Sequence, residues 1–77
     1  MAALYDLRGL KCPLPVLKAR RRLQRLSPGE DLIVTTTDPL AVIDIAHMCN
    51  EDGHRLLETQ ETGDGHRFHI RKGDGPV

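Results

Sequence analysis

The chain has 77 residues, of which 39% are hydrophobic and 29% are charged, so we expect one small domain spanning residues 1–77. Its two cysteines exclude a framework of several disulfide bonds, and no apolar stretch suggests a signal peptide or a membrane span. A cytoplasmic protein with reduced thiols is therefore expected. Residues 1–26 hold seven Lys or Arg and one acid, whereas residues 27–77 hold four Lys or Arg and ten acids. Any basic surface that faces a partner should lie in the first third of the chain.

The first half of the chain predicts a strand, a helix and a second strand. Residues 3–7 alternate well enough for a short strand, and Gly9 then interrupts the pattern. From Pro13 onward apolar residues recur at helical spacing, and residues 27–30 supply the turn that ends the helix. Residues 31–37 are rich in β-branched side chains and predict a strand in a central position. The apolar stripe of the helix consists of Val16, Ala19, Leu23 and Leu26.

The second half of the chain predicts another helix and a β-hairpin. Asp38 is expected to cap this helix and Pro39 to occupy its first position, while Gly53 should end it in a left-handed conformation. Residues 54–62 and 66–72 predict two strands joined by a Gly-Asp-Gly turn. The apolar stripe of this helix consists of Val42, Ile45, Ala46 and Cys49.

The element order is therefore β-α-β-α-β-β. Strand–helix–strand units require right-handed parallel crossovers, whereas the last two strands form an antiparallel hairpin. Because both helix stripes must be buried, we expect an α+β two-layer sandwich in which two helices cover one face of a mixed four-stranded sheet. Residues 73–77 are expected to form a frayed tail.

The stretch Gly-Leu-Lys-Cys-Pro-Leu-Pro, residues 9–15, combines a thiol with two prolines. Pro13 and Pro15 fit the first and third positions of the first helix, where a missing N–H group costs little. Cys12 then falls at the N-cap. Leu14 precedes a proline and is biased away from helical angles, so the first turn should be irregular.

Cysteine is a poor N-cap when neutral, because Ser, Thr, Asp and Asn accept backbone hydrogen bonds better. A thiolate at that position would be favoured by the positive end of the helix and by the nearby cations Arg8 and Lys11. These conditions lower the pKa of a thiol. We therefore predict a reactive, displayed Cys12 rather than a buried and inert one.

The segment DLRGLKCPLPVLKAR resembles the signature of the small TusA/SirA-type sulfur carriers, whose mark is Cys-Pro-x-Pro after a Gly-Leu-x loop. The resemblance continues through SPGEDLIVTTTDP to FHIRKG, and so covers about residues 4–73. It implies a two-layer βαβαββ fold like that of the C-terminal domain of translation initiation factor three. It also implies a cysteine that accepts sulfane sulfur as a persulfide from a cysteine desulfurase or a rhodanese. The sulfur would then pass to a relay or acceptor protein in tRNA thiolation, sulfur oxidation or molybdenum-cofactor biosynthesis.

The family's functional cysteine maps onto Cys12 and its prolines onto Pro13 and Pro15. Arg20 matches a basic position that family members use against their donor, and Leu14 stands where some carriers have Glu. Such a protein is a carrier that turns over only with partner proteins, and it needs no cofactor. We expect a monomer. The residues expected to contact a partner are Leu14, Arg20 and Arg21.

Two other functions stay open at this point. A non-catalytic module could bind RNA or a regulator through the basic first helix, although the scarcity of aromatic residues argues against direct nucleic-acid binding. A thiol redox protein would need a Cys-x-x-Cys pair, which the chain lacks. Cys49 lies on the apolar stripe of the second helix, so we expect a core residue rather than a resolving thiol. No metal site is expected, because neither His47 with Cys49 nor His66 with His69 faces the same way.

Overall fold

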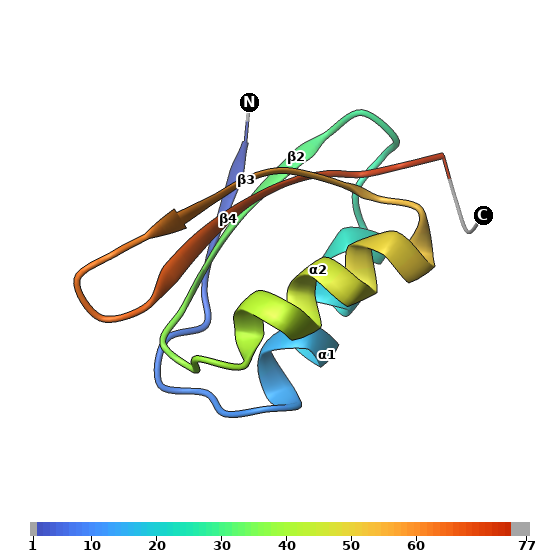
Figure 1. The fold of residues 1–77 in the computed structure, drawn as a ribbon. Helices are drawn as coiled ribbons and strands as arrows, with labels where there is room; N and C mark the ends of the chain where they lie inside the picture. Colours follow the sequence, from blue (N-terminus) through green and yellow to red (C-terminus); the bar gives the residue numbers. More distant parts are fainter. Residues whose placement is uncertain (1, 75–77) are drawn as a thin grey trace.

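The computed structural model describes residues 2–74 and has the predicted order of elements (Figure 1). The described part of the chain contains no helix that is long and apolar enough to cross a membrane. The elements are β1 (Ala3–Asp6), α1 (Leu14–Gln24), β2 (Asp31–Thr36), α2 (Ala41–Asp52), β3 (Arg55–Glu61) and β4 (His66–Arg71).

The four strands form one mixed sheet in the order β1-β2-β4-β3. β1 is parallel to β2, whereas β4 is antiparallel to both β2 and β3. Both helices lie on the same face of the sheet, and the other face is open (Figure 1). The predicted two-layer α+β fold, with its central second strand and closing hairpin, is confirmed.

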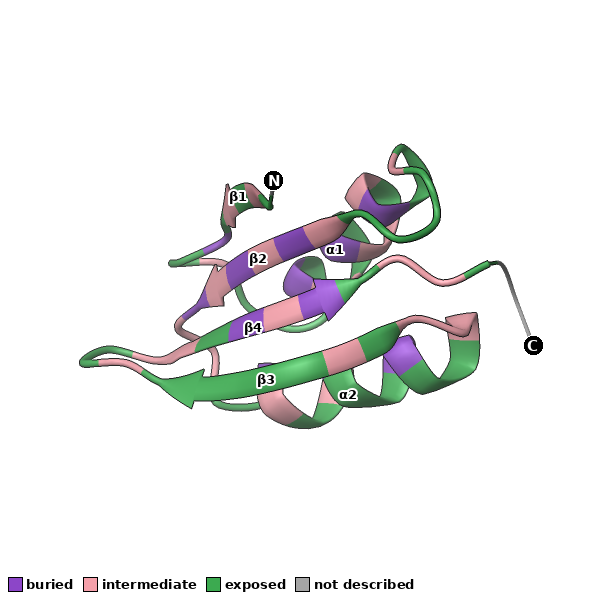
Figure 2. Ribbon diagram, turned by 90° about the horizontal axis from the view of Figure 1, so that it is seen from above, coloured by how far each residue is buried: buried purple, intermediate pink, exposed green. Residues whose placement is uncertain are grey.

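The core lies between the sheet and the two helices, where Figure 2 shows the buried positions of β2 and β4 alternating with less buried ones. The predicted stripe of α1 is confirmed at its centre by the fully buried Ala19 and Leu23. The predicted stripe of α2 is wrong at Ala46, which is exposed. Met48 takes its place, because it follows Ile45 by one helical turn. The buried hydrophobic residues are Leu7, Ala19, Leu23, Leu32, Val34, Ala41, Ile45, Met48, Cys49, Phe68 and Ile70.

The start of α1 differs from the prediction. Pro13, not Cys12, is the N-cap, and its carbonyl accepts a hydrogen bond from the Leu17 amide at 3.1 Å. A turn closes before the helix, with the Leu14 amide donating to the Lys11 carbonyl at 2.8 Å. Because this turn delays the helix by one residue, Cys12 lies in the loop rather than at the positive end of α1.

The start of α2 also lies later than predicted. The helix begins at Ala41 with Leu40 at the N-cap, so Pro39 precedes the helix instead of occupying its first position. Asp38 organises the turn before the helix: its Oδ1 accepts from the Leu40 amide at 3.2 Å, and its carbonyl accepts from the Ala41 amide at 3.0 Å. At the other end, Gly53 is left-handed with φ of 75°, as predicted.

The hairpin and the end of the chain pack closely against other backbone segments. A side chain at Gly65, in the β3–β4 turn, would collide with the Thr36 carbonyl, which explains the glycine there. The Gly73 amide donates to His54 Nδ1 at 3.1 Å. Of the tail expected at residues 73–77, residues 75–77 lie outside the described part of the chain.

Candidate functional site

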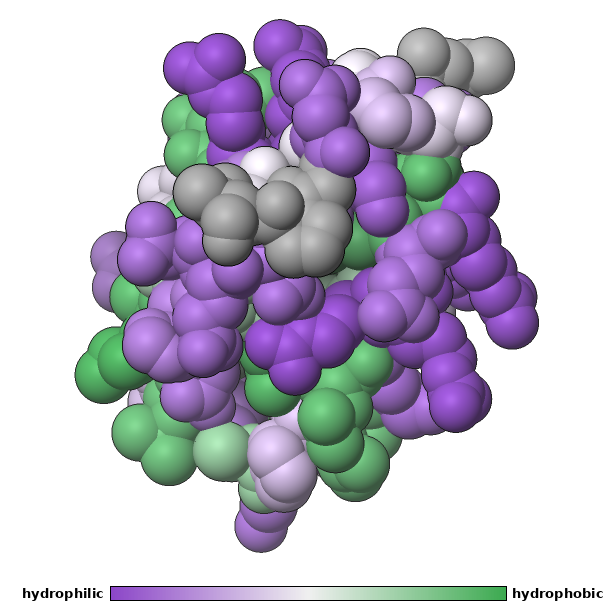
Figure 3. Space-filling model, turned by 90° about the vertical axis from the view of Figure 1, so that its right-hand side faces the viewer, coloured by the Kyte–Doolittle hydropathy of each residue, from purple (hydrophilic) through white to green (hydrophobic). Residues whose placement is uncertain are grey.

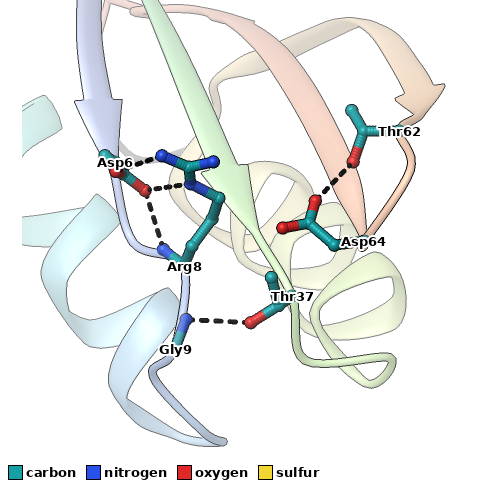
Figure 4. A network of polar contacts seen from close by, with 6 residues as sticks. All are labelled: Asp6, Arg8, Gly9, Thr37, Thr62 and Asp64. Atoms are coloured by element: carbon teal, nitrogen blue, oxygen red, sulfur yellow. Dashed lines mark hydrogen bonds and ion pairs between the residues drawn. The ribbon is translucent and has the colours of Figure 1, made fainter.

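The site forms where two parallel strands end. β1 and β2 run in the same direction, so the loop that leads to α1 and the loop that leads to α2 leave the sheet at the same edge (Figure 1). Two hydrogen bonds join these loops. The Gly9 amide donates to Thr37 Oγ1 at 2.8 Å (Figure 4), and the Cys12 amide donates to Asp38 Oδ2 at 2.6 Å. The loop of Cys12 is therefore fixed by the segment before the other helix.

Cys12 is exposed, as predicted for a displayed thiol, but its electrostatic surroundings are the opposite of those predicted. Its Sγ donates a hydrogen bond to Asp44 Oδ2, in the first turn of α2, at 3.0 Å. The pKa of the Cys12 thiol is raised, first by this hydrogen bond, then by desolvation and by the negative charges of Asp44 and Asp38. The prediction of a lowered pKa is therefore wrong, because carboxylates surround the sulfur where cations were expected.

Arg8, expected to stabilise the Cys12 thiolate, instead forms an ion pair with Asp6. Its Nη2 lies 2.9 Å from Asp6 Oδ2, and its Nε donates to Asp6 Oδ1 at 2.9 Å (Figure 4). These bonds lower the pKa of the Asp6 carboxyl to about 2. The positive charge of Arg8 is thus held at the end of β1. Lys11, the other expected cation, is exposed next to Cys12 and lines a pocket that Cys12 also lines.

Arg20 connects the two helices beside the site. Its Nε donates to Asp52 Oδ2 at 2.7 Å, and its Nη2 lies 3.6 Å from Glu51 Oε1. The side chain is about one third exposed and lines a pocket that Cys12 also lines. The basic residue predicted from the motif therefore lies close to the thiol, with part of its surface open to a partner.

Two shallow pockets meet at Cys12. One, of about 430 Å³, is formed by residues 9–12 and 37–40 of the two joined loops. The other, of about 230 Å³, lies between the two helices. A group docked in either pocket can reach the sulfur. Besides Cys12, the second pocket is lined by Pro13, Val16, Arg20, Asp44, His47, Met48 and Glu51.

Leu14 and Arg21, expected to contact a partner, line a third hollow of about 550 Å³ along α1, which shares Arg20 with the pocket between the helices. This α1 groove combines five exposed or half-exposed cations with the exposed Leu14 and Leu17. The exposed side of the helix layer also includes the apolar Leu40 and Ile43 of the α2 start. In Figure 3, apolar side chains gather in the lower part of the face, at the level of the helices in Figure 1. The cations of the groove, apart from Arg20, are Lys18, Arg21, Arg22 and Arg25.

Sequence reasoning missed Asp44 and the second role of Asp38. Asp44 is 32 residues from Cys12, so only the fold brings them together. Counted from the predicted helix start at Pro39, Asp44 falls in the second turn, and only the observed start at Ala41 places it in the first turn beside Cys12. Asp38 was expected to cap a helix, but one of its oxygens holds the Cys12 amide.

The second thiol, Cys49, is not displayed beside Cys12. Cys49 is buried in the core, as predicted, and burial raises the pKa of its thiol to about 11. Among residues 2–74, no group of three or more His, Cys, Asp or Glu side chains is arranged to hold a metal ion.

The fold and the site define a small two-layer α+β protein that displays one of its two thiols between two loops. The family model described as "Sulfurtransferase TusA" matches residues 4–72. The chain belongs to this family. It is 40% identical over 67 residues to the sulfur carrier protein TusA of Allochromatium vinosum, an alignment that covers 87% of this chain and 88% of that protein. The resemblance carried by the Cys-Pro-x-Pro stretch is thereby confirmed.

Proposed function

We propose that this TusA-family chain carries sulfane sulfur as a persulfide on Cys12 and passes it to an acceptor protein. The observation that carries the proposal is the placement of Cys12: an exposed thiol in the family's Cys-Pro-x-Pro motif, with a pocket on either side. A carrier needs a sulfur that two partners can reach in succession. Cys49 is buried and does not compete for the load.

The loading reaction is a thiol–persulfide exchange. The Cys12 thiolate attacks the outer sulfur of the donor's persulfide, the donor's S–S bond breaks, and the donor leaves as a thiolate that takes up the proton lost by Cys12. Unloading repeats these steps with the acceptor's thiol as the nucleophile, so no external oxidant or reductant is needed. The raised pKa leaves little thiolate on the free carrier, but the thiolate of a weakly acidic thiol is the stronger nucleophile.

A cysteine desulfurase or a rhodanese would be the donor, since both present a protein persulfide. Partner docking would use Arg20 beside the sulfur together with Leu14 and Arg21 of the α1 groove. Opposite charges on two surfaces speed their encounter, so the groove favours partners with an acidic docking surface. The acceptor would act in tRNA thiolation, sulfur oxidation or molybdenum-cofactor biosynthesis.

RNA binding through α1 is the alternative, and the geometry of the groove argues against it. Single-stranded RNA is held by aromatic rings on which bases stack, together with cations along the backbone. The chain has one Tyr and one Phe. The Arg22 guanidinium already lies 4.2 Å from the centre of the Tyr5 ring, and Phe68 is fully buried.

Intact-mass spectrometry tests the carrier function directly. The purified chain is incubated with a cysteine desulfurase, cysteine and pyridoxal phosphate, and in a second arm with a rhodanese and thiosulfate. We expect a reducible mass gain of one sulfur atom on the wild type and on Cys49→Ala, and none on Cys12→Ser. If neither donor adds sulfur to the wild type, or if Cys12→Ser still gains it, the proposal is wrong. RNA binding that weakens steeply with salt and survives Cys12→Ser would support the alternative.

A further inference from the structure

Asp44 is the acid in direct contact with the Cys12 sulfur. Asp44 is the fourth residue of α2 and is half-buried. Its Oδ2 accepts the hydrogen bond from the Cys12 sulfur at 3.0 Å. No other hydrogen bond of the Asp44 side chain competes with this one among the described residues. The contact therefore joins a negatively charged oxygen to the atom that would bear the sulfur.

The other charged groups around the sulfur do not neutralise this carboxylate. From the β2–α2 loop, Asp38 adds a second negative charge. From α1, Arg20 points to Asp52 and Glu51 rather than to Asp44. The other polar groups beside Cys12 are Lys11, which is adjacent in sequence and exposed, and the imidazole of His47, whose Nε2 lies 3.4 Å from Glu51 Oε1.

The two states of the carrier respond to Asp44 in opposite ways. The unloaded thiol can donate a hydrogen bond to the carboxylate, as the structure shows. A persulfide is more acidic than the thiol from which it forms, so the loaded state is an anion at neutral pH. This anion has no proton to donate and is repelled by the carboxylate. The contact thus stabilises the unloaded state and destabilises the loaded one.

We infer that Asp44 is a positioning residue that biases the exchange on Cys12 toward release of sulfur, so that the carrier passes its load on instead of retaining it. This inference rests on the proposed function. No new chemical step is involved: Asp44 shifts the equilibrium of the exchange, in which one S–S bond breaks for each one that forms. The outer sulfur would turn away from Asp44 toward the pocket on the other side of Cys12, where Leu10 and Leu40 provide apolar walls.

The equilibrium itself can be measured without a protein partner. Each variant is equilibrated at pH 7.5 with a fixed mixture of glutathione and glutathione persulfide, and the ratio of loaded to unloaded chain is read by intact mass. Asp44→Asn, which keeps the shape and removes the charge, should hold a loaded-to-unloaded ratio higher than the wild type by about threefold to tenfold. Asp44→Glu should stay close to the wild type. The matched control is Glu58→Gln on β3, which makes the same charge change at an exposed position and should leave the ratio unaltered.

A second readout is independent of sulfur carriage. The rate of Cys12 alkylation by iodoacetamide is followed against pH, and the curve of Asp44→Asn should move to lower pH because a thiolate no longer faces a carboxylate. A wild type that cannot be loaded by any donor would refute the carrier function, whereas this curve would still report the coupling of the two residues. The inference is overturned if the wild type loads normally and Asp44→Asn partitions sulfur as the wild type does. It is also overturned if Glu58→Gln shows the same change as Asp44→Asn.

Discussion

A cluster of charged groups on the open face of the sheet differs from the cluster around Cys12 at the loop edge, where the loops to α1 and α2 leave the sheet. On the open face of the sheet, Asp31 accepts from Arg71 Nε at 2.8 Å and lies 2.7 Å from His69 Nε2, so a carboxylate is matched by cationic or hydrogen-bonding partners. These contacts, the Arg71 bond first, lower the pKa of the Asp31 carboxyl to about 2. At the loop edge, the Cys12 sulfur faces Asp44 and its pKa is raised. The first cluster stabilises the Asp31 carboxylate, whereas the second destabilises the Cys12 thiolate.

The difference separates groups that join the strands of the fold from groups at the proposed sulfur-carrying site. The matched charges link the neighbouring strands β2 and β4 within the chain, without a partner protein. At the exposed thiol, the carboxylates disfavour the thiolate and not the neutral thiol, so this cluster bears on the reactivity of the sulfur more than on the stability of the fold. Substitutions in the first cluster should therefore change stability and spare sulfur transfer, and substitutions in the second should do the reverse.

The largest effect is expected from Asp38→Ala at the loop edge. This change removes the acceptor of the Cys12 and Leu40 amides, so the loop that carries the sulfur loses its attachment to the α2 start. Misplacing a reacting atom by about 1 Å can cost up to about a hundredfold in rate. We expect the initial rate of loading by a cysteine desulfurase to fall by about tenfold, with a small change in Tm. An unchanged loading rate would show that the attachment does not position the thiol.

Arg20→Ala should affect both properties, because Arg20 joins α1 to α2 and lines a pocket at the thiol. The loss of a partly exposed ion pair should lower the free energy of unfolding by about 1 kcal/mol in urea titrations. The loading rate should fall by a few-fold, about the effect of one lost docking contact. Arg20→Lys keeps the charge and serves as the control. If stability falls and loading does not, Arg20 acts only as a link between the helices.

Asp31→Asn should alter acid stability and leave sulfur transfer intact. The Asp31 pKa is lowered in the folded chain, so its stabilising contribution is present above the ordinary value of 3.8 and is lost as the pH falls from there toward about 2. Asp6 has a similarly lowered pKa and contributes over the same range. Thermal melts at steps between pH 5 and pH 2 should therefore show a weaker loss of Tm for Asp31→Asn than for the wild type. An identical pH dependence would indicate that the open-face cluster does not stabilise the fold.

Arg8→Ala should have the smallest effect and tests the corrected electrostatics of the site. Arg8 is occupied by Asp6, so removing it should leave the pH dependence of Cys12 alkylation where it is in the wild type. A shift of that curve to higher pH would show that Arg8 does favour the thiolate. The same experiment on Lys11→Ala separates the contribution of the cation next to the thiol.

The sequence was enough to predict the fold because its patterns are local. The apolar spacing of Ala19 and Leu23, the β-branched run of β2 and the turn at Gly53 each specify one element. The exposure of the Cys12 thiol was predicted in the same way, from the prolines beside it. Its charge environment could not be found, because Asp44 reaches it across 32 residues and the competing bond from Arg8 to Asp6 had to be known first. A helix starting one residue later removed the cap on which the expected pKa depended.

The outer strand β3 bears on how freely the protein can leave its partners. Its pairing with β4 shifts register between Leu56 and Glu58, and every residue from Leu57 to Glu61 is exposed. Such irregularities and charged side chains make a strand a poor template for pairing with another sheet. A carrier that docks on a donor and then on an acceptor, as proposed, would gain from an edge that binds neither through its backbone. At this one of the two edge strands, recognition would therefore rely on side chains, from which a short-lived complex can dissociate.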